Sequence, residues 1–262
     1  MVASPDAGRP ALMSCDGTMF PSPSLTLSHA QLHQCAQYAR IRMARDGAEW
    51  MFMMPLYVLG HYFGDDWVGK HLFAASFLKP PSGKTDRPKQ QQVGQHGYQL
   101  SENLFNLQNV EGFDGIHSRL LKGEIEPCIG ELEAARFLKL RGEQIRFVTP
   151  KGKLGEDYDL EILRETGAIC CEVKIRLEAE ELTEEWAYSR LGDAREQLPK
   201  SKPGLTFLRI VGVLTNDELQ AKARIIDKAV RRLFGQTKRI IGVVLLTRGY
   251  QFSEDGMATW SL

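Results

Sequence analysis

The stretch Ala168-Ile169-Cys170-Cys171-Glu172-Val173-Lys174-Ile175 decides the fold, because it places an acid and a base inside an apolar run typical of a β-strand. Side chains alternate along a strand, so Glu172 and Lys174 point to one face and their apolar neighbours point to the other. Charges removed from water lower stability unless they find partners. The pattern therefore predicts that Glu172 and Lys174 serve a functional site.

Two acidic segments precede this strand. The run Asp157-Tyr158-Asp159-Leu160-Glu161-Ile162-Leu163 predicts another strand, and Asp157 and Asp159 share one of its faces. Residues 125–141 predict a helix that carries Glu131 and Glu133 and stops at Gly142. An acid on a helix, an acid on a strand and an acid-x-Lys on the next strand form the pattern of a metal-dependent phosphodiesterase.

The remaining segments after this helix predict an α/β fold. Strands are expected at residues 145–149, 158–163, 168–175, 205–214, 239–247 and 258–262, and helices at residues 178–198 and 217–234. With the helix at 125–141 in front, this order predicts a mixed β-sheet flanked by helices on both faces.

An all-α region is expected ahead of the sheet. Ser28 could cap a helix over residues 29–45, further helices are expected at 49–63 and 67–78, and residues 80–97 predict a polar loop. We therefore expect three parts. They are a flexible tail at 1–24, a helical region at 25–120 that serves recognition, dimerisation or regulation, and the α/β domain at 121–262.

Composition places few limits on the partner. The formal net charge is zero, so any surface for nucleic acid must be local. The five cysteines form no CxxC pair and the N-terminus shows no secretory signal, which predicts a reduced, cytoplasmic protein. The most apolar stretch, residues 51–63, is shorter than the about 20 residues that span a bilayer, so no membrane association is expected.

The acidic residues have the chemistry that a divalent metal ion requires. Mg²⁺ prefers oxygen ligands and usually takes one or two carboxylates together with water and phosphate oxygens. Asp159 and Glu172 on neighbouring strands could supply those ligands, and the carbonyl of Val173 could add another. Lys174 would orient the attacking water and offset charge on the phosphate. Carboxylates packed together without a cation would have raised pKa values, so a metal ion or Lys174 is expected among them.

These residues resemble the PD-(D/E)XK, or restriction-endonuclease-like, nuclease superfamily, with spacing similar to its Holliday-junction resolvases. The resemblance covers residues 125–210. The helix from Glu131 to Gly142 corresponds to the helix that carries the Glu of such nucleases, and Glu172-Val173-Lys174 matches the last motif. Gly155-Glu156-Asp157-Tyr158-Asp159 replaces the Pro-Asp element without a Pro. The distance from Asp159 to Glu172 is resolvase-like and favours Asp159, with Asp157 as the alternative. The distance from Glu131 to Gly142 likewise favours Glu131, with Glu133 as the alternative.

The resemblance implies a metal-dependent nuclease, most simply a DNA endonuclease in defence or repair that uses Mg²⁺ or Mn²⁺. It implies metal ligands, a lysine that positions water, and a supporting Gln197 on the helix after the last motif. The expected metal ligands are Glu131, Asp159, Glu172 and Val173, with Asp157 as the alternative. A homodimer is expected because one such site cuts one strand. The alternative is an inactive module that keeps the nuclease fold and binds nucleic acid or another protein.

Overall fold

The structure is a computed structural model that describes residues 23–46, 50–74, 87–153, 155–176, 181–210, 216–247, 249–252 and 258–261. Its contacts divide the chain into two compact units, Met1–Gln108 and Asn109–Leu262. The three-part division expected from the sequence stays a prediction. All of the expected tail except residues 23 and 24 lies outside the described residues.

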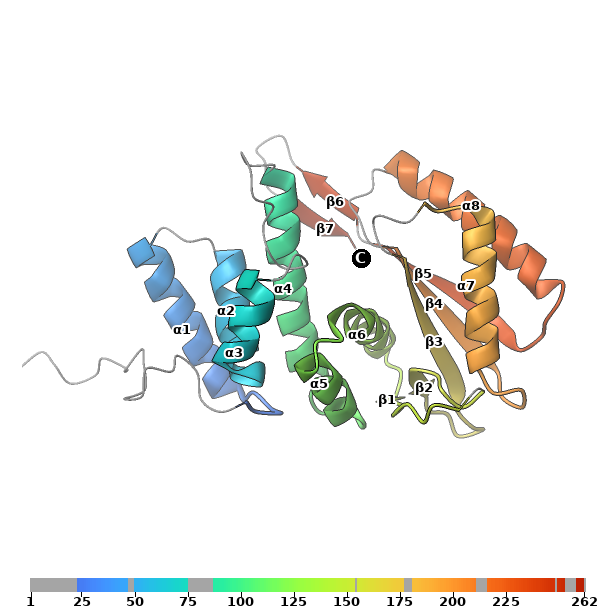
Figure 1. Ribbon diagram of the computed structural model, residues 1–262, viewed down its shortest axis with the longest axis horizontal. Helices are drawn as coiled ribbons and strands as arrows, with labels where there is room; N and C mark the ends of the chain where they lie inside the picture. Colours follow the sequence, from blue (N-terminus) through green and yellow to red (C-terminus); the bar gives the residue numbers. More distant parts are fainter. Residues whose placement is uncertain are drawn as a thin grey trace, which may run out of the picture. The chain divides into compact units, whose positions relative to one another are not determined.

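The first unit consists of helices (Figure 1). They are α1 (His29–Asp46), α2 (Trp50–Phe63), α3 (Asp65–Val68), the π-helix η1 (Gly69–Ala74) and α4 (Arg87–Leu107). The Oγ of Ser28 accepts a hydrogen bond from the N–H of Gln31 at 3.2 Å, which confirms the expected cap of α1. No helix in the described part of the chain is long and apolar enough to cross a bilayer.

The loop expected at residues 80–97 is wrong from residue 87 onward, because α4 begins at Arg87. Gly97 is buried on α4, where an added Cβ would come within 3.3 Å of the Pro55 Cβ on α2. Leu100 and Leu104 of α4 are completely buried. Packing against neighbouring helices therefore overrides the polar local composition that predicted a loop. Residues 80–86 of the expected loop lie outside the described residues.

The second unit contains a five-stranded mixed sheet. Its strands are β1 (Ile145–Phe147), β2 (Leu160–Ile162), β3 (Ile169–Arg176), β4 (Gly204–Ile210) and β5 (Ile240–Thr247), in the order β1-β2-β3-β4-β5. The β1–β2 and β2–β3 pairs are antiparallel, whereas the β3–β4 and β4–β5 pairs are parallel. The expected α/β fold with a mixed sheet is confirmed. The helix α5 (Phe113–Leu121) and the pair β6 (Gly249–Phe252) and β7 (Ala258–Ser261) complete the unit.

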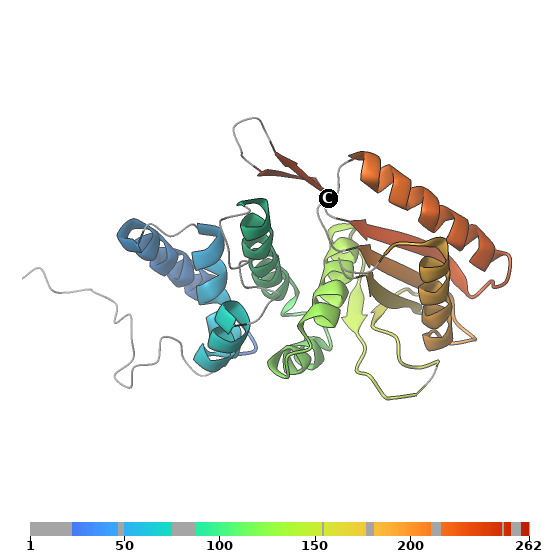
Figure 2. The ribbon, with the colours of Figure 1, turned by 45° about the horizontal axis from the view of Figure 1, so that its top comes forward.

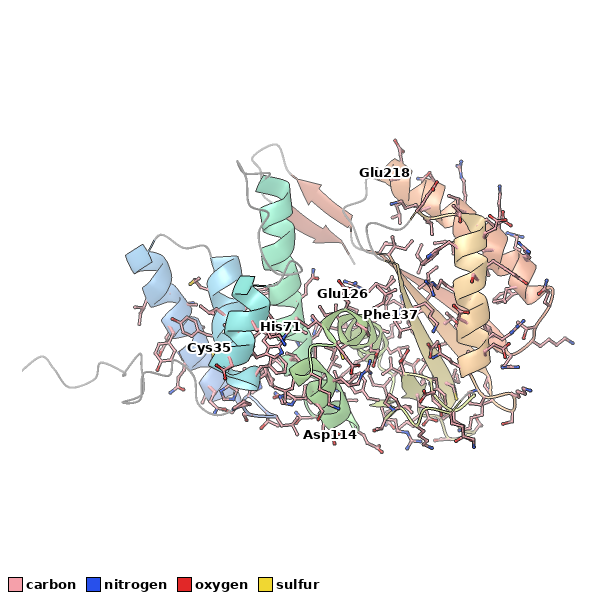
Figure 3. The ribbon with its side chains drawn as sticks, viewed as in Figure 1. Cys35, His71, Asp114, Glu126, Phe137 and Glu218 are labelled. Carbon is pink, nitrogen blue, oxygen red and sulfur yellow. The ribbon has the colours of Figure 1, made fainter. Side chains whose placement is uncertain are left out.

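Helices cover both faces of this sheet (Figure 2). The helix α6 (Ile125–Leu140) lies on one face, and α7 (Glu184–Gln197) and α8 (Asn216–Phe234) lie on the other. Phe137 of α6, labelled in Figure 3, meets Phe207 of β4 edge to face, with ring centroids 6.1 Å apart. On the other face, Cys170 and Leu208 of the sheet pack against apolar side chains of α7 and α8.

The helix ends follow local chemistry. Gly142 follows α6 with a φ of 80°, a left-handed conformation that glycine adopts without strain, so the expected stop is confirmed. The helix α7 begins at Glu184 rather than at 178, because the Oγ1 of Thr183 accepts the N–H of Trp186 at 3.0 Å. Residues 177–180 of that prediction lie outside the described residues.

Candidate active site

Glu172 and Lys174 lie on β3 and point toward α7. The Nζ of Lys174 lies 2.8 Å from the Oε1 of Glu172 and also donates a hydrogen bond to the Oε1 of Gln197 at the end of α7. Glu172 is only 2% exposed, and Lys174 is half-buried. Because Glu172 and Lys174 pair with Thr206 and Leu208 of β4, the acid and the base stand on a fixed strand, as their alternation predicts.

Asp159 joins this pair from the segment just before β2. Its N–H donates to the carbonyl of Cys171 at 3.0 Å, and its Oδ2 accepts the N–H of Val173 at 2.7 Å. Two hydrogen bonds to β3 therefore fix the backbone and the carboxylate of Asp159 beside Glu172. Val173 meets the cluster through its N–H, and the role of its carbonyl as a metal ligand stays a prediction.

Glu131 reaches the cluster from α6. Gly130, the residue before it, lies so close to β3 that an added Cβ would stand 2.6 Å from the Cδ1 of Ile175. This close packing brings Glu131 near the sheet, where its side chain is 4% exposed. The Nη1 of Arg119 on α5 donates to the Oε2 of Glu131 at 2.8 Å. Arg119 is a member of the cluster that the sequence did not reveal.

The electrostatics of the cluster are those of crowded, buried acids. Burial raises the pKa of Glu172, and the charge of Asp159 raises it further against the opposing effect of Lys174. Burial and the charge of Asp159 likewise raise the pKa of Glu131, although Arg119 opposes the shift. Burial raises the pKa of Asp159, whereas the hydrogen bond from the N–H of Val173 and the charge of Lys174 both act to lower it. Three carboxyl groups are thus held together at a cost in free energy when they are ionised.

A divalent cation fits these residues. The Oε2 of Glu172 is buried and accepts no hydrogen bond from a nitrogen of the chain, and the Glu172 carboxyl group bonds Asp159 only by keeping a proton, which a bound cation would replace. Among the described residues, no three His, Cys, Asp or Glu side chains already form a metal cage. Mg²⁺ needs no such cage, since it usually takes one or two carboxylates and completes its shell with water and phosphate. Asp159 and Glu172 supply that number.

The other acidic candidates do not join the cluster. The Oδ1 of Asp157 accepts the N–H groups of Lys151 and Gly152 at 2.6 and 3.2 Å, so Asp157 holds the loop before β2. Glu133 points to the sheet from α6 and forms a buried ion pair with Arg209 of β4. The sequence left Glu133 open as the alternative to Glu131, and this ion pair gives it a partner outside the cluster.

Glu161 on β2 is another buried acid outside the cluster. Its side chain is buried, with 2% exposed. The Nη2 of Arg146 on β1 lies 2.5 Å from its Oε2, the hydroxyl of Tyr158 donates to its Oε1, and Lys202 lies 3.5 Å away. These partners outweigh the effect of burial and lower the pKa of Glu161.

Comparisons with known proteins add little to this geometry. No protein-family model and no curated protein sequence matches the chain. One solved structure, SfsA from Pyrococcus furiosus in complex with Ca²⁺, is similar over 50% of this chain, with 14% identity and a TM-score of 0.24. The similar part spans 59% of that protein, which is less than two thirds of its length.

Proposed function

We propose that this chain is a divalent-metal-dependent nuclease that hydrolyses phosphodiester bonds, acting as an endonuclease on DNA in defence or repair. One observation supports the proposal: Lys174 pairs with Glu172 and Gln197, Asp159 is bonded to β3 beside them, and Glu131 is close enough for the charge of Asp159 to raise its pKa. These residues come from α6, β3, α7 and the segment before β2. The resemblance of their motifs to PD-(D/E)XK nucleases supplies the substrate class.

Each residue has a role that follows from its contacts. Asp159 and Glu172 would hold Mg²⁺ or Mn²⁺, with Glu131 and the carbonyl of Val173 as further candidates. When bound, such an ion polarises a phosphoryl oxygen and makes water more acidic. Lys174 would orient the attacking water and offset charge on the phosphate, because its ammonium group lies beside Glu172 at 2.8 Å. Gln197 would keep that ammonium group in place.

The second candidate is an inactive module that binds nucleic acid or protein through the same fold. The specific observation in its favour is that the chain supplies its own cations, since Lys174 pairs with Glu172 and Arg119 pairs with Glu131. Three buried carboxylates still exceed these two cations, and the Oε2 of Glu172 accepts no hydrogen bond from a nitrogen of the chain. A module without chemistry gains nothing from that cost, so we favour the nuclease.

The first experiment compares wild-type protein with Lys174→Ala on plasmid and linear DNA, in Mg²⁺, Mn²⁺ or EDTA. Lys139→Ala is the matched control, because Lys139 is an exposed lysine of α6. We expect metal-dependent cutting by the wild type and the control. Loss of the residue that positions the attacking water lowers the cleavage rate by about 100-fold or more in Lys174→Ala.

The other outcomes separate the alternatives. Metal binding without cleavage of these DNAs would contradict DNA of ordinary structure as the substrate, and RNA and branched DNA would be tested next. No cleavage and no metal binding would contradict the nuclease and leave the inactive module. Equal cleavage by Lys174→Ala and wild type would place the active site elsewhere.

A further inference from the structure

Arg119 is the one charged member of the cluster to which the proposed reaction gives no role. Its Nη1 donates to the Oε2 of Glu131 at 2.8 Å, and its Nε donates to the Oε2 of Glu124 at 2.9 Å. The Arg119 side chain is 18% exposed and that of Glu131 is 4% exposed. Two carboxylates therefore hold the guanidinium group, which is always charged in proteins.

The net charge of the side chains in the cluster limits the number of divalent cations that it can bind. Glu131, Asp159, Glu172 and Glu124, which also accepts from Arg119, face two cations, Lys174 and Arg119, so two negative charges are in excess when all four acids are ionised. One divalent cation brings this excess to zero before substrate binds. A second divalent cation would leave two uncompensated positive charges in a site with little access to water, which is costly.

The contacts of Glu131 agree with this count. An ion placed between Glu131 and Asp159 would compete with Arg119 for the Oε2 of Glu131. The carboxyl group of Glu172, whose Oε2 accepts no hydrogen bond from a nitrogen of the chain, interacts instead with Asp159. Among the described residues, Asp159 and Glu172 can take a cation, whereas the Oε2 of Glu131 is already bound to Arg119.

We propose that Arg119 takes the place of a second metal ion, so that the site binds a single divalent cation at Asp159 and Glu172. This inference rests on the proposed function. Arg119 is a positioning residue: it favours the ionised form of Glu131 and supplies, through a fixed guanidinium group, the positive charge that two-metal nucleases obtain from another ion.

The test counts Mn²⁺ ions bound to the full chain without substrate, by titration followed with electron paramagnetic resonance. We expect one ion per wild-type chain. Arg119→Gln removes the competing charge, so it should bind the first Mn²⁺ about tenfold more tightly and take up a second ion at Glu131. Arg119→Lys keeps the charge and should still bind one.

The matched control is Arg164→Gln, because Arg164 forms an ion pair with Glu143 at 2.6 Å outside the cluster. It should bind Mn²⁺ like the wild type. Two ions on the wild-type chain would overturn the inference, and so would an Arg119→Gln variant that binds like Arg164→Gln. If Arg119→Gln does not fold, the wild-type and Arg119→Lys counts still decide, since either one reaching two ions contradicts the inference.

The inference and the proposed function fail in different ways. A wild-type chain that cuts DNA with Mg²⁺ and binds two ions overturns the single-ion inference and leaves the nuclease intact. A wild-type chain that binds no divalent ion overturns both.

Discussion

Asp157 and Asp159 stand two residues apart, and only Asp159 reaches β3. We predict that Asp159→Asn weakens Mn²⁺ binding by at least about tenfold, because outer and inner ligands of a metal commonly contribute that much. Cleavage should fall with it. Asp157→Asn should leave Mn²⁺ affinity unchanged, since its carboxylate accepts only the N–H groups of Lys151 and Gly152. Isothermal titration measures both affinities.

Asp157→Asn is also the control for folding. It weakens two hydrogen bonds to a charged acceptor, so the free energy of unfolding should fall by about 1–2 kcal/mol. Asp159→Asn removes a carboxylate whose burial raises its pKa, so it should not destabilise the metal-free protein to the same degree. If Asp157→Asn loses metal binding and Asp159→Asn keeps it, the assignment of the two residues is reversed.

Single residues of the site differ in how far the sequence could reveal them. Glu172 and Lys174 were predictable because their alternation on one strand is a local pattern. Arg119 was not, since its partner Glu131 is 12 residues away and α5 carries no motif. Glu133 could not be separated from Glu131 by sequence, because its partner Arg209 lies 76 residues further along the chain. Burial of a charge depends on a partner that local patterns cannot show.

At the scale of elements, α6 and β3 set the position of Glu131. An Ala at position 130 would place its Cβ 2.6 Å from the Cδ1 and 2.9 Å from the Cγ1 of Ile175. We predict that Gly130→Ala lowers the free energy of unfolding by about 1–2 kcal/mol, because overpacking outweighs the helix propensity gained. It should also lower cleavage, because α6 must move and Glu131 moves with it. Urea unfolding and the cleavage rate measure the two effects.

Gly192 of α7 provides the control, because an added Cβ there meets nothing within 4 Å. Gly192→Ala should stabilise the protein by up to about 1 kcal/mol and leave cleavage unchanged. Ile175→Ala added to Gly130→Ala removes both clashing atoms and should restore part of the lost activity. A Gly130→Ala protein that is as active and as stable as Gly192→Ala would show that this contact does not position Glu131.

The elements were predictable where hydrophobic pattern and packing agree. The alternation in β3 and the stop at Gly142 are local, and the structure confirms both. The beginning of α4 was missed because a segment rich in Gln and Gly is weak as an isolated helix. Its burial comes from contacts such as that of Gly97 with Pro55, which no local pattern contains.

At the scale of the whole molecule, a chain with no net charge concentrates negative charge in one cluster. The cost of that concentration depends on pH. A carboxyl group whose pKa is raised in the folded state binds more protons there than in the unfolded state. The stability that it contributes is present at low pH and is lost as the pH rises through the folded pKa. Burial raises the pKa values of Glu131, Asp159 and Glu172, so all three act in this direction.

We therefore predict that Mg²⁺ stabilises the protein more at mildly alkaline than at mildly acidic pH. The ion binds the ionised carboxylates and must displace protons that the free site holds at low pH. Its stabilising effect should grow by up to about 1.4 kcal/mol per pH unit for each proton displaced. Urea unfolding with Mg²⁺ or EDTA across this pH range measures it. Asp159→Asn should abolish the difference, and an equal Mg²⁺ effect at all pH values would show that the ion does not bind at these carboxylates.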